Sequence, residues 1–158
     1  MCNAYKAALQ NEINSFGDTN GQLLLTINDL NDCVINPISQ SKISVTVGQF
    51  AKVFNKDITV NLIGTTRKIK AFNNALPSEF ISFELLQGDS GQNKITNFVI
   101  HLSNKDYTVL PLNEGGVWST NISINTANRI LGTFGGYVTS IETGAYLDLT
   151  AGSIDLTL

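Results

Sequence analysis

The chain has 158 residues, of which 42% are apolar and 15% are charged, and its net charge is −3 at pH 7. This length and apolar content suit one folded domain and argue against disorder, while the negative charge and the lack of a basic stripe argue against nucleic-acid binding. No apolar run approaches the roughly 18 residues that predict a transmembrane helix. Asn, Thr, Ser and Gly supply most of the polarity, which is typical of cell-envelope or extracellular proteins.

The first segment of the chain has the pattern of an amphipathic helix, from Asn3 to Phe16. The apolar residues Tyr5, Leu9, Ile13 and Phe16 recur at helical spacing and are expected on one face. Ala residues favour the helix, and Gly17 stands where a C-terminal cap belongs. We expect residues 1–17 to form a helix that packs on a sheet. A helix on a membrane surface is the alternative, but the polar side lacks the Lys and Arg typical of one.

The rest of the chain, residues 18–158, is expected to form a single antiparallel β-domain. Apolar residues alternate with polar ones in short runs that are separated by turn residues, which is typical of strands. The runs are Leu23–Ile27, Cys33–Ile35, Ile43–Val47, Ile58–Leu62, Arg67–Ala71, Ile81–Leu85, Phe98–Leu102, Tyr107–Val109 and a meander over Trp118–Leu158. About ten strands at this spacing predict an all-β fold, an antiparallel β-sandwich or barrel with one N-terminal helix.

The two cysteines, Cys2 and Cys33, leave three interpretations open. They pair as a disulfide in an oxidising compartment, or they are unrelated and Cys33 is a small buried residue, or Cys2 is a lipid-attachment site. The chain enters directly as Met1-Cys2-Asn3 without a signal peptide, and in the third interpretation Met1 replaces an export signal that has been removed. Neither cysteine has partners at a spacing that predicts catalysis or metal binding.

No group of residues has the pattern of an active site, so we predict a protein that is not an enzyme and that has no catalytic, cofactor-binding or metal-binding residues. His101 is the only histidine and lies in the middle of a strand, without a serine or cysteine in a nucleophile motif. The candidate acidic residues stand singly in turns or on strand faces: Glu79, Glu84, Asp106, Glu114 and Asp148. Gly135-Gly136 lies inside a strand pattern, which predicts a bulge rather than a phosphate-binding loop.

Aromatic residues are the other candidates for a binding surface. Trp118 shares a face with Thr120, Ile122 and Ile124, which predicts core packing, with a ligand-binding face as the alternative. Tyr107, Tyr137 and Tyr146 are candidates for an outer face.

The last strands contain, in this order, Ser123-Ile124, Arg129-Ile130-Leu131-Gly132-Thr133-Phe134, Thr143-Gly144 and Leu149-Thr150-Ala151-Gly152-Ser153-Ile154-Asp155-Leu156. This order resembles a family of small Bacteroidota envelope lipoproteins of unknown function. Members of that family tend to end in a strand, a G-T-F strand, a short turn and a T-x-G-x-F strand. Ile154 replaces the last aromatic residue, and the match covers about the last forty residues. The resemblance implies an envelope β-sandwich, compatible with lipidation at Cys2, and no functional residues.

Two functions are therefore predicted. The first is a non-enzymatic envelope or extracellular protein with a binding or structural role, whose partner is another protein, a glycan or a second copy of itself. The second is a structural subunit that assembles into a filament, tube or surface layer through its last strand, because an apolar strand at the chain end is able to complete a neighbouring sheet. That strand comprises Ser153, Ile154, Asp155, Leu156, Thr157 and Leu158.

Overall fold

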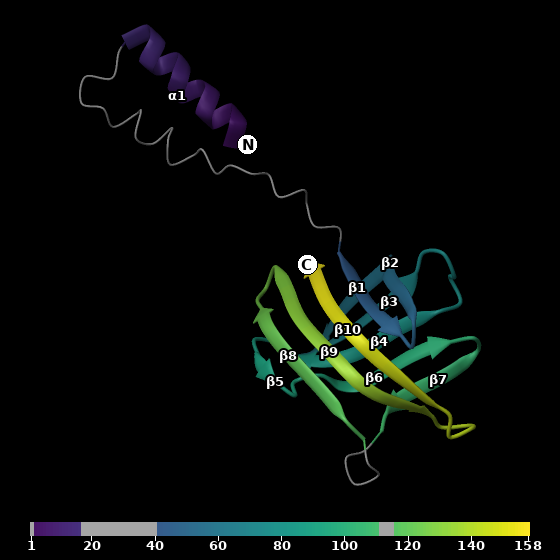
Figure 1. Ribbon diagram of the computed structural model, residues 1–158. Coiled ribbons are helices and arrows are strands. Elements are labelled where there is room, and N and C mark those ends of the chain that lie inside the picture. Colours follow the sequence, from purple (N-terminus) through teal and green to yellow (C-terminus); the bar gives the residue numbers. More distant parts are fainter. Residues whose placement is uncertain (1, 17–40, 111–115) are drawn as a thin grey trace. The chain divides into compact units, whose positions relative to one another are not determined.

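The computed structural model describes residues 2–16, 41–110 and 116–158 (Figure 1). The chain divides into two compact units, Met1–Ile38 and Ser39–Leu158. The first unit contains a helix, α1 (Cys2–Phe16), and all strands of the described residues lie in the second. The predicted helix is thus confirmed with an N-terminus one residue earlier. Leu9 is buried and Ile13 is half-buried, whereas Phe16 at the last position is exposed. Packing of α1 on the sheet stays a prediction.

The second unit is an antiparallel β-barrel, which confirms the predicted fold class. Eight strands close on one another, and two outer strands continue the sheet beside β9. The barrel strands are β1 (Lys42–Val47), β2 (Phe50–Ile63), β3 (Thr66–Asn73), β4 (Phe80–Leu86), β6 (Thr96–Leu102), β7 (Lys105–Val109), β9 (Arg129–Ser140) and β10 (Tyr146–Thr157). The outer strands are β8 (Trp118–Asn125), which pairs with β9, and the short β5 (Gly91–Gln92), which pairs with β8.

The core fills the barrel because apolar residues recur at every second position of the strands. In β1, for example, Ile43, Val45 and Val47 are buried while the residues between them are partly exposed. Burying one such aliphatic side chain stabilises the fold by roughly 1.5–3 kcal/mol. The largest fully buried side chains are Phe54, Phe83, Ile43, Ile69, Ile81, Leu85, Ile100, Ile122, Ile130, Leu149, Ile154 and Leu156.

Strand β10 closes the barrel, because it pairs with β1 on one side and with β9 on the other (Figure 1). A register shift between Leu149 and Gly152 marks a bulge in this strand. A Cβ atom on Gly152 would lie 2.3 Å from the carbonyl oxygen of Phe134, so the close approach of β9 and β10 at the bulge requires glycine there.

At one end of the barrel, strand β2 extends beyond the strand β1 beside it. Strand β2 pairs with β1 only over residues 50–54, so its second half, residues 55–63, pairs with β3 alone among the described strands. At this end Ser41 exchanges two hydrogen bonds with the backbone of Thr157. The inward face of the second half of β2 therefore borders a gap beside the end of β10.

Candidate functional site

Arg67 lies near the start of β3 and faces the barrel interior. It alternates with Ile69 and Ala71, and all three side chains are buried. Its neighbours across the sheet are Leu62 on β2 and Leu85 on β4. The strand register therefore carries a guanidinium group into one end of the barrel, which is named the Arg67 end from here on.

The side chain of Arg67 has one hydrogen-bond partner among the described residues. Its Nη1 donates to Oδ1 of Asn125 over 2.5 Å. The amide nitrogen of Asn125 donates to the carbonyl oxygens of Leu86 and Asp89 over 2.7 and 2.8 Å. These two bonds fix the orientation of the amide, because only its nitrogen is able to donate to carbonyls. The amide oxygen is thereby held toward Arg67.

The charge of Arg67 is not balanced by a carboxylate in the part of the chain that the structure describes. Its side chain is 4% exposed, yet none of the ion pairs within residues 41–110 and 116–158 includes it. A guanidinium carries five N–H donors, and burial of an unpaired charge is costly. Among these residues, Oγ1 of Thr120 is the one fully enclosed side-chain nitrogen or oxygen that has no hydrogen bond. The nitrogens of Arg67 that form no hydrogen bond are therefore not fully enclosed, and they reach open space.

That space is a groove of about 520 Å³, named the Arg67 groove. Its apolar wall comes from β2, where Ile58 and Val60 pack partly against the core and Leu62 is 53% exposed. Leu158 borders it from the chain end. No Asp or Glu is among the described residues that line the groove. The groove thus combines an apolar wall with a buried cation whose donors are largely unshared.

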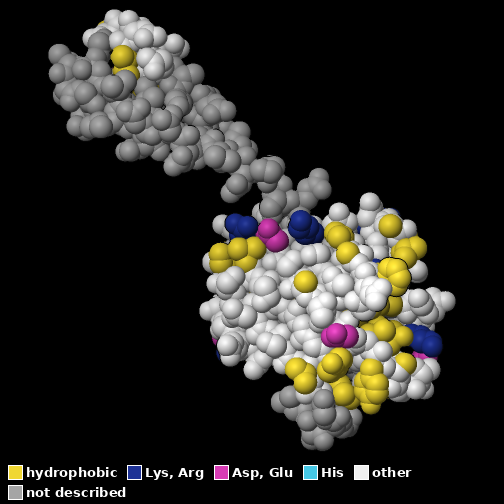
Figure 2. Space-filling view, viewed as in Figure 1, with side chains coloured by type: hydrophobic (Ala, Val, Ile, Leu, Met, Phe, Trp, Pro, Cys, Tyr) yellow, Lys and Arg dark blue, Asp and Glu magenta, His cyan; other side chains and the backbone are white. Residues whose placement is uncertain are grey.

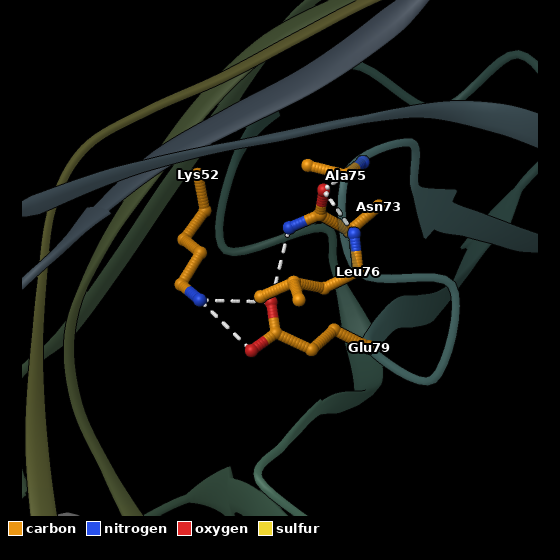
Figure 3. A network of polar contacts seen from close by, with 5 residues as sticks. All are labelled: Lys52, Asn73, Ala75, Leu76 and Glu79. Carbon is orange, nitrogen blue, oxygen red and sulfur yellow. Dashed lines mark hydrogen bonds and ion pairs between the residues drawn. The ribbon is translucent and has the colours of Figure 1, made fainter.

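The other end of the barrel, named the Lys52 end, holds a cation whose partners are complete (Figure 3). Nζ of Lys52 lies 2.8 Å from both carboxylate oxygens of Glu79, and Nδ2 of Asn73 donates to the same carboxylate over 3.0 Å. Oδ1 of Asn73 accepts hydrogen bonds from the backbone N–H groups of Ala75 and Leu76. This network fastens the loop between β3 and β4 over the barrel, which is a structural role.

His101 belongs to a row of contacts that runs across β3, β4, β6 and β7. Its Nδ1 lies 2.6 Å from Oδ1 of Asp106, and its ring stacks on Phe80 with 5.0 Å between centroids. Nζ of Lys70 lies 3.9 Å from the centroid of Phe80. The contacts of His101 are thus those of a residue that stabilises the barrel wall.

The predicted acidic residues are not brought together. Glu79 binds Lys52, Asp106 binds His101, and Glu84 lies 2.9 Å from Nζ of Lys68. The hydrogen bonds from Lys68 and, second, from Asn97 hold the pKa of Glu84 below its usual value of 4.5. Asp148 is exposed on β10 and Glu114 lies outside the described residues. Each of the three paired carboxylates therefore has its own basic partner.

The predicted lipid and disulfide sites are not tested. Cys2 is the first residue of α1, but its side chain lies outside the described part, as does all of Cys33. Lipid attachment at Cys2 therefore stays a prediction.

The predicted assembly strand lies inside the barrel wall. Ser153, Ile154 and Asp155 each have one neighbour on β1 and one on β9, and Ile154 and Leu156 are buried in the core. Assembly through Ser153–Leu158 stays a prediction, and it would require this segment to leave its neighbours first.

The aromatic residues divide between core and surface. Trp118 packs against Phe98 and Phe134, with centroids 4.7 and 6.0 Å away, as core packing predicts. Tyr137 and Tyr146 are exposed, as expected for an outer face. Tyr107 is buried instead, because it lies opposite the core residue Ile100 and shares its inward face.

Sequence reasoning did not single out Arg67 as a site residue, although it placed the residue at the start of the expected strand Arg67–Ala71. The signal was the two-residue period, which puts Arg67 on the same face as Ile69.

Comparison of the chain with protein-family models, curated proteins and solved structures gave no match. In the described part, no helix has the length and apolar character needed to cross a membrane.

Proposed function

We propose that this chain is a non-enzymatic binding protein of the cell envelope or the extracellular space, and that its ligand is a small molecule with an apolar body that occupies the Arg67 groove. The observation that carries the proposal is the open inward face of β2. Ile58 and Val60 belong to the inward face of the barrel, but β1 does not extend far enough to cover them.

A ligand in this groove gains free energy from the apolar surface that it covers, at about 25 cal/mol for each Å² removed from water. The groove volume of about 520 Å³ falls within the roughly 300–1,000 Å³ that is usual for small-molecule sites. Residues at the mouth remain exposed without a ligand, including Leu62 at 53% and Leu158 at 41%. These are the side chains that a bound molecule would cover.

The envelope or extracellular location rests on the surface chemistry of the chain. Charged residues make up 15% of the sequence, and Figure 2 shows few charged side chains on the face of the barrel that it draws. A hydroxyl- and amide-rich surface is expected of a protein outside the cytoplasm. Fractionation of the cells that make the protein tests this part, and recovery in the cytoplasmic fraction alone would contradict it.

Binding is tested by titrating the folded protein with 1-octanol in a calorimeter. Leu62→Trp fills the Arg67 groove with a larger side chain and should weaken binding at least tenfold. Leu76→Trp is the matched control, because Leu76 is 48% exposed and lies at the Lys52 end. Equal affinities of both variants and the unchanged protein would show that the ligand binds elsewhere.

A further inference from the structure

We infer that the Arg67 groove selects ligands that carry one negative charge, a carboxylate at the end of an aliphatic body, and that Arg67 holds this head group. The inference rests on the proposed function and adds to it the chemical class of the ligand. It depends on a separate observation, the unshared donors of Arg67, whereas the apolar wall of β2 carries the proposed function.

The first step is the hydrogen-bonding capacity that Arg67 retains. The guanidinium has five N–H donors, and the bond to Asn125 uses one of them. Four donors are left on a side chain that is 4% exposed. Hydrogen bonds from a guanidinium to a carboxylate are charge-assisted and often bidentate, so an anionic head group satisfies these donors better than a hydroxyl does.

The second step is the rigidity of the guanidinium. Asn125 receives its orientation from the carbonyl groups of Leu86 and Asp89, and it holds Nη1 of Arg67 in turn. Leu62 and Leu85 flank the side chain from the neighbouring strands. A donor group that is already fixed loses little conformational entropy when a ligand binds, and this favours affinity.

The third step is the charge balance, which sets the number of negative charges. Arg67 is the only buried Lys or Arg among the described residues, and no acidic side chain lines the groove with it. The nearby cation Arg129 is already paired with Asp155 at 3.3 Å on the surface. One buried positive charge balances a monoanion, whereas a dianionic phosphate would bring a second charge without a partner.

The test is a head-group series with one eight-carbon body: octanoate, 1-octanol, octyl phosphate and octyltrimethylammonium, each titrated into the full chain at pH 7 below its micelle concentration. We expect octanoate to bind roughly ten- to hundredfold more tightly than 1-octanol, which is the usual effect of a hydrogen bond to a charged group. Octyl phosphate should bind no more tightly than octanoate, and the ammonium compound should bind most weakly.

Two variants, each with a matched control, assign the effect to Arg67. Arg67→Gln should bring octanoate down to the affinity of 1-octanol, whereas Lys68→Gln removes the same charge from the outer face of β3 and should change nothing. Leu62→Glu places a carboxylate opposite Arg67 and should weaken octanoate binding about tenfold or more. Ile63→Glu, the exposed neighbour in sequence, is its control.

The outcomes separate the inference from the proposed function. Octanoate and 1-octanol of equal affinity, both unaffected by Arg67→Gln, would overturn the anion selectivity and leave the apolar binding site intact. Tighter binding of octyl phosphate than of octanoate would overturn the claim that the ligand carries one negative charge. No binding of any compound would overturn both. If Arg67→Gln does not fold, Leu62→Glu decides, and undiminished octanoate binding in that variant would count against the inference.

Discussion

The two ends of the barrel each turn a cation inward, and they differ in what surrounds it. At the Lys52 end, Glu79 supplies a carboxylate that contacts Lys52 through both oxygens, and Asn73 completes the network. At the Arg67 end, the guanidinium meets a neutral amide and an apolar groove. Both cations lie on inward positions of the strands, so the alternation of the strands does not explain the difference.

The difference teaches that the partners of a buried charge indicate its role. A fully partnered pair such as Lys52 and Glu79 fixes the loop that supplies the carboxylate, and removing one partner leaves the other uncompensated. A buried charge with unshared donors stabilises little by itself, but it is ready to bind an anion. The following predictions test this comparison, from the largest expected effect to the smallest.

The largest effect is expected for Glu79→Gln at the Lys52 end. The substitution leaves Lys52, whose side chain is 20% exposed, without a negative partner. We expect the free energy of unfolding to fall by roughly 2–3 kcal/mol, measured by urea denaturation. Glu142→Gln, in the exposed turn after β9, is the control. A loss no larger than that of the control would mean that the network is not structural.

The next effect has the opposite sign and belongs to the Arg67 end. Leu62→Glu supplies the carboxylate that the guanidinium lacks, so the free energy of unfolding at pH 7 should rise by about 1 kcal/mol. Ile63→Glu adds the same charge on the other face of β2 and should not stabilise the protein. Equal urea midpoints for the two variants would indicate that Arg67 is already satisfied.

A smaller effect is expected for Arg67→Gln in the absence of a ligand. Glutamine still offers a donor to Asn125, and the substitution removes a buried charge that has no ionic partner among the described residues. The free energy of unfolding should change by less than about 1 kcal/mol, since replacing such a charge is often neutral. Urea denaturation with an unchanged slope checks this, and a loss as large as that of Glu79→Gln would remove the contrast between the two ends.

The smallest effect concerns the pH dependence of the pair on the barrel wall, Lys68 and Glu84. Because the pKa of Glu84 is lowered by Lys68 and Asn97, its contribution to stability is complete above the usual value of 4.5 and is lost as the pH falls through the lowered pKa. The stability difference between the unchanged protein and Glu84→Gln should therefore be constant well above pH 4.5 and should shrink as the pH falls below that value. A difference that stays constant would contradict the pKa shift.

The fold class could be predicted because strands such as Ile43–Val47 carry a clear two-residue period. The first half of β2 was not predicted, and Asp57 explains why. This residue has a positive φ of 47°, and the register with β3 shifts between Lys56 and Thr59. Phe54 and Ile58 face inward on the two sides of this shift, but the residues between them, 55–57, are all polar, so the stretch lacks the alternation that marks a strand.

The candidate site could be predicted only in part, because its partners are distant in the sequence. The inward position of Arg67 follows from its alternation with Ile69. Asn125, in contrast, is 58 residues away, and the lack of a carboxylate beside Arg67 in the part of the chain that the structure describes depends on the closed barrel. The length of β1 relative to β2, which leaves the groove open, is likewise a property of strand pairing rather than of local sequence.

The most direct test of the central claim is the ratio of the affinities for octanoate and 1-octanol, measured by calorimetry on the full chain and on Arg67→Gln at pH 7. The account predicts a ratio of roughly ten or more for the unchanged protein and a ratio near one for the variant. The same ratio in both proteins would show that Arg67 does not hold the head group, and the contrast between the two ends would lose its functional meaning.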